Sequence, residues 1–103
     1  MLNNLLLQLS GQIEFDTQKR LQTLLVRGLD FARASEIFAD AVAEIEDSRR
    51  VYGEQRFITY GFLDSRLVVL VWTKRENKMR VISMRRANER EIKKYTHRVD
   101  WSR

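Results

Sequence analysis

Arginines stand at the ends of several predicted strands, and they are the residues of this sequence best suited to chemistry. Arg80 opens the stretch RVISMRRA, and Arg85 and Arg86 close it. Arg56 opens an earlier strand. Each guanidinium is a planar, permanently charged fork that fits phosphate oxygens. Because antiparallel neighbours bring the ends of different strands together, we expect several of these groups to form one anion site.

The alternation of side chains along a strand restricts this site. With period 2, Arg80 and Arg86 share one face of their strand and Arg85 lies on the other. Arg80 and Arg85 then serve one site only if the strand twists or ends before Arg85. The alternative is that these arginines pair with acidic residues of the same sheet. Trp72 is either a platform on which an unpaired base stacks or a core residue.

Other catalytic chemistries have few residues to draw on. The 103 residues include no cysteine and a single histidine, His97, which excludes a disulfide scaffold, a thiol nucleophile and a histidine pair. Glu44 and Glu46 alternate on a predicted strand, where they form either a metal site or, as is more common, a solvated face. We expect no metal and no cofactor. The net charge of +5 and the pI near 10.0 favour an anionic partner such as nucleic acid.

The elements that position the arginines predict one α+β domain. Asp16 and Gly28 delimit a helix over 17–27, and a capping box at Asn88 and Glu91 starts the last helix. The remaining expected elements are strands over 12–16, 41–47, 55–62, 66–73 and 78–85 and a helix over 31–40. We expect an antiparallel sheet of about four strands with two N-terminal helices and one C-terminal helix.

One domain over 13–103 is expected, preceded by an extension over 1–12. In that extension Leu2, Leu5, Leu6 and Leu9 fit a helical stripe. No apolar run reaches the length of a membrane span, so we expect a cytoplasmic protein without a membrane contact.

Several short motifs, taken in order, resemble the BrnT family of bacterial toxins, which is similar to the RelE-like ribonucleases. The resemblance covers about 14–95. It departs from the family at Thr23, where asparagine is usual, at Val26-Arg27 before Gly28, where Lys-His is usual, and at Arg50, where histidine is common. The motifs are FD with Lys19 following, the positions Gly28, Phe31, Ala34 and Phe38, the stretches GEQRFITYG, RLVVLVWT and RVISMRRA, and Glu89, Arg90 and Tyr95.

The resemblance implies a RelE-like ribonuclease that cuts messenger RNA and arrests growth until a BrnA-type antitoxin inhibits it. It implies a hetero-oligomer with that antitoxin, with DNA contacted only through the antitoxin. Arg80 and Arg85 are the candidates for stabilising the transition state, and Lys19 is a candidate acid/base or phosphate contact. The candidate RNA-binding residues are Arg56, Trp72 and Arg86. The alternative function is a non-catalytic module that binds nucleic acid or the antitoxin.

Overall fold

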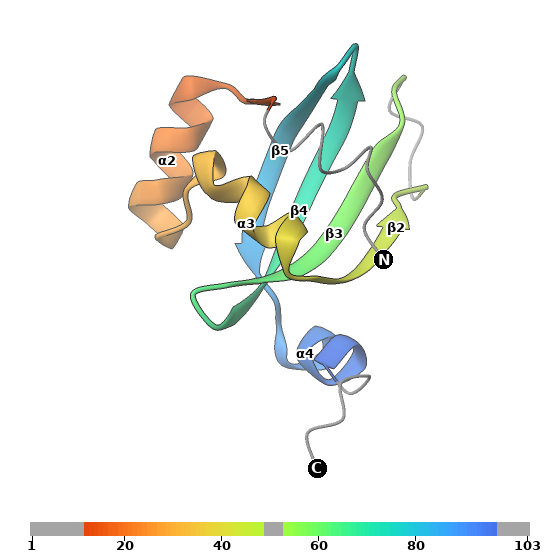
Figure 1. The fold of residues 1–103 in the computed structure, drawn as a ribbon. Coiled ribbons are helices and arrows are strands. Elements are labelled where there is room, and N and C mark those ends of the chain that lie inside the picture. The colour runs from red at the N-terminus through yellow and green to blue at the C-terminus, as the bar shows by residue number, and fades with distance from the viewer. Residues whose placement is uncertain (1–11, 49–52, 97–103) are drawn as a thin grey trace.

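A mixed five-stranded sheet forms the centre of the computed structural model of this chain, in the order β1-β5-β4-β3-β2 (Figure 1). The structure describes residues 12–48 and 53–96. The strands are β1 (Ile13–Glu14), β2 (Ala41–Glu46), β3 (Arg56–Leu63), β4 (Arg66–Arg75) and β5 (Lys78–Arg86). The helices are α2 (Thr17–Arg27), a short 3-10 turn η1 (Phe31–Arg33), α3 (Ala34–Ala39) and α4 (Glu89–Thr96). In the described ranges, no helix has the length and apolar character needed to cross a membrane.

The α+β class is confirmed, but the predicted four-stranded antiparallel sheet is wrong. The strand expected over 12–16 is present as β1, but it joins the sheet as a fifth strand. It pairs with β5 in parallel, with Ile13 opposite Met79 and Glu14 opposite Arg80. A two-residue strand shows too little alternation to reveal its partner or its direction. The leucine stripe of the expected extension, Arg50 and His97 lie outside the described residues.

Local signals at the helix ends are confirmed. The Asp16 side chain accepts from the Lys19 backbone N–H, and Gly28 ends α2 in the left-handed region at φ 71°. Asn88 and Glu91 form the reciprocal capping box, with hydrogen bonds of 2.9 and 2.8 Å. These contacts are local in sequence, which is why the sequence predicts these helix ends well.

The main core lies between α3 and one face of the sheet. Figure 1 shows α3 crossing this face, with α2 beside it and α4 beyond one end of the sheet. Phe31, Ala34, Ile37 and Phe38 are at most 2% exposed and pack against strand residues. Those strand residues are Leu63, Val68, Leu70, Trp72, Met79, Val81 and Met84. This packing holds the central strands rigid, so their end residues have fixed directions.

A second, smaller cluster lies on the opposite face, where Tyr95 of α4 packs with Tyr60. Ile92, an apolar residue of α4, is 41% exposed, whereas a helical period of 3.6 would place it with Tyr95 and Val99 on one side of the helix. Val99 lies outside the described residues. Ile92 and Thr96 instead line a cavity between α4 and the strand residues Phe62 and Leu67.

Polar contacts, rather than apolar burial, hold α2 against the sheet. The helix has no buried residue. Arg20 Nε lies 2.7 Å from Asp30 Oδ1, and Arg27 Nη1 donates to the Met84 carbonyl oxygen at 2.8 Å. Its leucines face outward, with Leu25 86% exposed. Therefore α2 contributes charged side chains to the edge of the sheet and little to its core.

Candidate functional site

An extra residue in β5 brings Arg80 and Arg85 to the same face of the sheet. Arg80 pairs with Thr73 and Arg85 pairs with Val69. Thr73 and Val69 are an even number of residues apart on β4, so they share a face, and paired residues of antiparallel strands share theirs. The prediction that Arg80 and Arg85 lie on opposite faces is wrong.

The cause is a β-bulge at Ile82. Trp72 pairs with Val81 and Val71 pairs with Ser83, so Ile82 has no partner of its own on β4. One unpaired residue shifts the alternation by one position for the rest of the strand. Consequently Arg86, opposite Val68, points to the face covered by α3.

The face shared by Arg80 and Arg85 has guanidinium groups at its two ends. One row of the sheet contains Arg56, Thr73 and Arg80, and another contains Tyr60, Val69 and Arg85. The strand rise separates these rows by about 13 Å. Between them the row of Ile58 and Val71 forms an apolar floor, extended by Ile45, which is 44% exposed.

At the first end of this face, carboxylates accompany the arginines. Arg80 Nη1 lies 3.0 Å from Glu14 Oε2, which the parallel strand β1 brings opposite it. Glu54 lies 3.5 Å from Arg56 Nε and 3.4 Å from Arg75 Nη2. The alternative in which the arginines pair with acids of the sheet is therefore realised here. These ion pairs fix the guanidinium directions while leaving Arg80 29% exposed.

At the second end, Arg85 belongs to a cluster that the sequence analysis missed. Its two terminal nitrogens each donate to Glu91 at 2.8 Å. This bidentate contact lowers the pKa of Glu91 to about 2, with a further contribution from the Asn88 backbone N–H. Tyr60 and Tyr95 stack beside it with ring centroids 4.0 Å apart. Burial, helped by the hydrogen bond with Tyr95, raises the pKa of Tyr60 to about 12.

No local pattern reveals this cluster. Tyr60 and Arg85 meet because β3 and β5 both pair with β4 at Val69. Only the capping box of Glu91 is visible in the sequence, and it indicates a helix start rather than a partner for Arg85.

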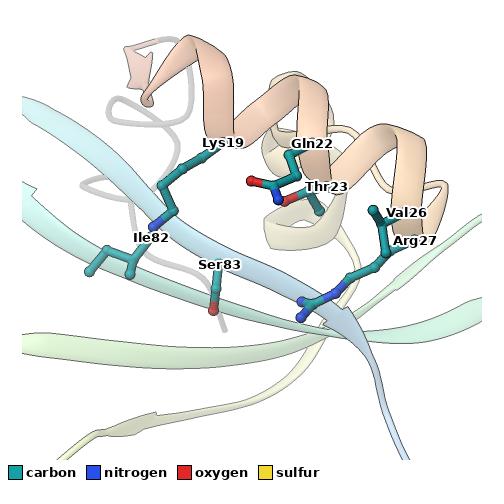
Figure 2. A pocket seen from close by; sticks show the side chains of 7 residues that line it. All are labelled: Lys19, Gln22, Thr23, Val26, Arg27, Ile82 and Ser83. Atoms are coloured by element: carbon teal, nitrogen blue, oxygen red, sulfur yellow. The ribbon is translucent and has the colours of Figure 1, made fainter.

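Lys19 lies apart from the two arginine ends. It lines a cavity of about 350 Å³ between α2 and β5, together with Ile82 and Ser83 (Figure 2). Arg27 points into the same cavity from the next turns of α2. The cavity therefore combines two cations of the helix with the bulge of β5, at the edge of the face that holds Arg80 and Arg85.

Trp72 is a core residue, and its assignment as a platform for an RNA base is wrong. Its side chain is 4% exposed and stacks on Phe57 with centroids 4.8 Å apart. Its indole N–H donates to Thr59 Oγ1 at 2.9 Å, and that hydroxyl donates to Glu44 at 3.0 Å. The buried N–H is thus satisfied within the core, and no ring face is left for a ligand.

The acidic residues of β2 do not assemble into a cluster. Glu44 accepts a hydrogen bond from Thr59, and Glu46 lies two pairs further along the strand, opposite Phe57. Within residues 12–48 and 53–96, no group of three or more histidine, cysteine, aspartate or glutamate side chains is arranged to hold a metal ion.

Comparison with known proteins identifies a family for most of the chain. A family model described as "Ribonuclease toxin, BrnT, of type II toxin-antitoxin system" matches residues 15–91. This match spans β2 to β5, α2, α3 and the start of α4, and it includes both arginine ends. No curated protein matches the chain.

Proposed function

Because the chain belongs to the BrnT family of ribonuclease toxins of type II toxin–antitoxin systems, we propose that it cleaves messenger RNA, without a metal ion, on a RelE-like fold. Family membership shows that the chain is a ribonuclease toxin and that its partner is a protein antitoxin. The observation that carries the finer proposal is the shared face of Arg80 and Arg85. A single RNA strand crossing the apolar floor between them meets a guanidinium at each end.

In this proposal the arginines stabilise charge rather than transfer protons. Attack by a 2′-hydroxyl or a water on phosphorus breaks the bond to the 5′-oxygen of the next nucleotide, which leaves and takes up a proton. Negative charge builds on the phosphoryl oxygens during this step, and preorganised cations lower the barrier. The ion pairs with Glu14 and Glu91 hold Arg80 and Arg85 in place before RNA arrives. The RNA phosphate competes with these carboxylates for the same donors. Such a site needs no histidine pair and no metal.

Lys19 and Arg56 have supporting roles in the proposal. Arg56 lies in the row of Arg80 and positions the RNA backbone there. Lys19 contacts a phosphate from the edge of the sheet, beside the bulge at Ile82. Trp72 is not part of the site, because it is buried.

We propose that a BrnA-type antitoxin binds the chain tightly in the cytoplasm and forms a hetero-oligomer with it. A basic substrate face is a natural target for an acidic or amphipathic inhibitor segment. DNA would be contacted only through the antitoxin. Co-expression with the neighbouring antitoxin gene should give a complex that survives purification, and separate chains at high yield would contradict this proposal.

A non-catalytic module remains the second candidate, because every arginine of the proposed face lies beside a carboxylate. Single-turnover incubation of the purified chain with labelled RNA separates the two functions. We expect defined cleavage products. Stable binding of RNA without cleavage, at any enzyme concentration, would favour the module.

A further inference from the structure

Two arginines outside the proposed face form no direct ion pair within residues 12–48 and 53–96. Arg66 opens β4 and Arg86 closes β5, and both are exposed. Arg86 pairs with Val68, two residues beyond Arg66, so the two arginines are diagonal neighbours on one face of the sheet. Neither makes an ion pair or a side-chain hydrogen bond with any residue in the described part of the chain. By contrast, Arg56, Arg80 and Arg85 each lie beside a carboxylate.

Arg66 and Arg86 also line the same two cavities at this end of the sheet. One cavity has a volume of about 280 Å³ and the other about 270 Å³. The first lies against Gly28, Leu29 and Leu63, and the second lies against α4. Two permanent cations thus face spaces large enough for an anionic group.

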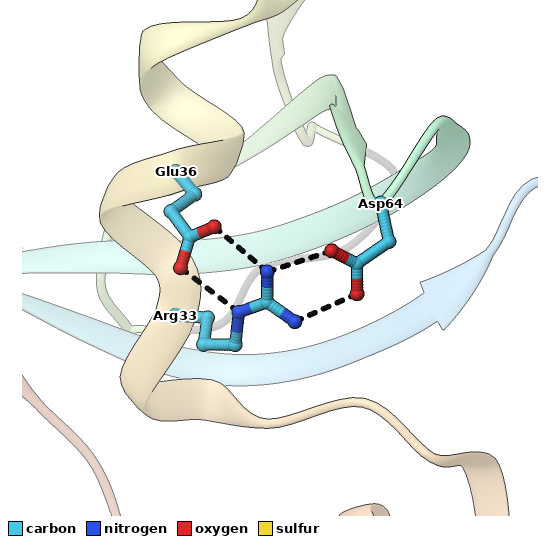
Figure 3. Close-up of polar contacts among 3 residues, drawn as sticks. All are labelled: Arg33, Glu36 and Asp64. Carbon is cyan, nitrogen blue, oxygen red and sulfur yellow. Dashed lines mark hydrogen bonds and ion pairs between the residues drawn. The ribbon is translucent and has the colours of Figure 1, made fainter.

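The one carboxylate in these linings is held elsewhere. Asp64 lines the first cavity, but both of its oxygens accept from Arg33, at 2.7 and 2.8 Å (Figure 3). The Arg33 hydrogen bonds lower the pKa of Asp64, so this carboxylate stays charged and stays with Arg33. Arg33 is itself fixed by Glu36 through two further contacts of 2.8 Å. Asp64 therefore interacts with Arg66 only through its charge, and it forms a direct ion pair with Arg33 rather than with Arg66 or Arg86.

We infer that Arg66 and Arg86 form a second phosphate site, which binds the RNA backbone after it leaves the face of Arg80 and Arg85. This inference rests on the proposed function. Arg85 and Arg86 are consecutive residues that point to opposite faces of the sheet at the end of β5. An RNA strand that crosses this end passes from one guanidinium to the next. The second site lengthens the RNA footprint beyond the scissile bond.

A phosphodiester backbone fits this pair better than a peptide carboxylate does. One carboxylate occupies one guanidinium fork, as Glu91 does on Arg85. Two neighbouring unpaired forks suit a group with charge on several oxygens, or two successive phosphates of one strand.

Binding of non-cleavable 2′-O-methyl RNA tests the inference whether or not the chain cleaves RNA. A long RNA and a short oligonucleotide, which spans only the first face, are titrated over a range of salt concentrations. We expect Arg66→Ala to lower the affinity for the long RNA about threefold. The double variant Arg66→Ala, Arg86→Ala should lower it about tenfold. Each change should lower the salt slope by about one. Short-RNA affinity should be unchanged, and Arg90→Ala, on exposed α4, is the control.

A second pair of variants tests the role of Arg33. Arg33→Ala should release Asp64 to pair with Arg66 and should weaken the long RNA. Adding Asp64→Asn should restore that affinity. If the loss of RNA affinity in Arg33→Ala persists after Asp64→Asn is added, the loss does not come from Asp64 pairing with Arg66. Arg33 then has no role in keeping Asp64 away from Arg66 and Arg86.

Three results would overturn the inference. If the Arg66→Ala, Arg86→Ala double variant binds long RNA with unchanged affinity and an unchanged salt slope, these two cations do not contact RNA. An equal loss for short and long RNA would place them in the first site. Loss of antitoxin binding with intact RNA binding would make this end of the sheet a peptide site. Failure of cleavage alone, with the expected binding pattern, would count against the proposed function and not against this site.

Discussion

Arg80 and Arg85 lie on one face of β5 because Ile82 is an unpaired extra residue between them. Four intervening residues would ordinarily put the two side chains on opposite faces. The bulge shifts the alternation of side chains by one residue. As a result, one face of the sheet has a guanidinium group at each end.

The first prediction concerns transition-state stabilisation by Arg80. Arg80→Ala should slow single-turnover RNA cleavage by roughly a hundredfold or more, because a lost charge donor raises the chemical barrier. RNA affinity should fall only modestly, since one phosphate contact is removed. Cleavage and binding are measured on the same folded preparation, with Arg90→Ala as control. An equal, small loss in both variants would make the Arg80 end an electrostatic surface only.

Chelation should leave cleavage intact. No three histidine, cysteine, aspartate or glutamate side chains gather around a cation position anywhere in the described ranges. Cleavage in excess EDTA should therefore match cleavage in magnesium, apart from the effect of ionic strength on RNA binding. Activity abolished by EDTA and restored by magnesium would instead point to Glu44 and Glu46.

The ion pair of Arg85 and Glu91 should make the free energy of unfolding depend on pH in the acidic range. The pKa of Glu91 is lowered from 4.5 to about 2 in the folded chain. A lowered pKa adds stability above the unfolded value, and this contribution is lost as the pH falls through the folded value. The difference in unfolding free energy between the parent chain and Glu91→Gln should therefore be largest above pH 4.5 and vanish towards pH 2. A difference that stays constant over this range would contradict the pairing.

Glu91→Gln suits this comparison because glutamine also accepts from a helix N-terminus and keeps the capping box with Asn88. Urea titrations at each pH give the two free energies. Other carboxylates titrate in the same range, so the difference between the variants is informative and the parent curve alone is not.

Gly61 should not tolerate a side chain. A Cβ at this position would overlap the Ile37 carbonyl oxygen and lie 2.8 Å from the Ile37 Cγ2 atom, where α3 packs closely on β3. Gly61→Ala should cost about 1–3 kcal/mol by overpacking. Gly53→Ala, where a Cβ meets nothing within 4 Å, is the contrast, although its φ of 76° adds some backbone strain. Urea unfolding of both variants measures the loss of stability. A smaller loss for Gly61→Ala than for Gly53→Ala would contradict the prediction.

Trp72 should act on stability rather than on RNA. Trp72→Ala should cost about 3–5 kcal/mol, because it removes a buried aromatic side chain from the centre of the core. Leu25→Ser, on the exposed side of α2, should change stability by less than about 0.5 kcal/mol. Thermal unfolding of the two variants gives the comparison. A folded Trp72→Ala variant with selectively weakened RNA binding would reinstate the stacking role.

The sequence by itself predicted most of the helices and strands and limited the types of chemistry open to the chain. Asp16, Gly28 and the capping box of Asn88 and Glu91 mark helix ends through contacts between residues at most a few positions apart. The apolar run in β4 indicated a deeply buried strand, and Val68 and Leu70 are fully buried there. Composition excluded thiol chemistry and a histidine pair, and it left the arginines as the candidate groups.

Only the tertiary structure decided which of those groups meet. The parallel pairing of β1, the bulge at Ile82 and the contact of Tyr60 with the Arg85 cluster each depend on strand register. Register is fixed by the packing of distant segments, and a shift of one residue reverses the face of every following side chain. For the same reason the sequence named Arg86 but placed it on the face of Arg80, whereas the structure puts it beside Arg66 on the opposite face.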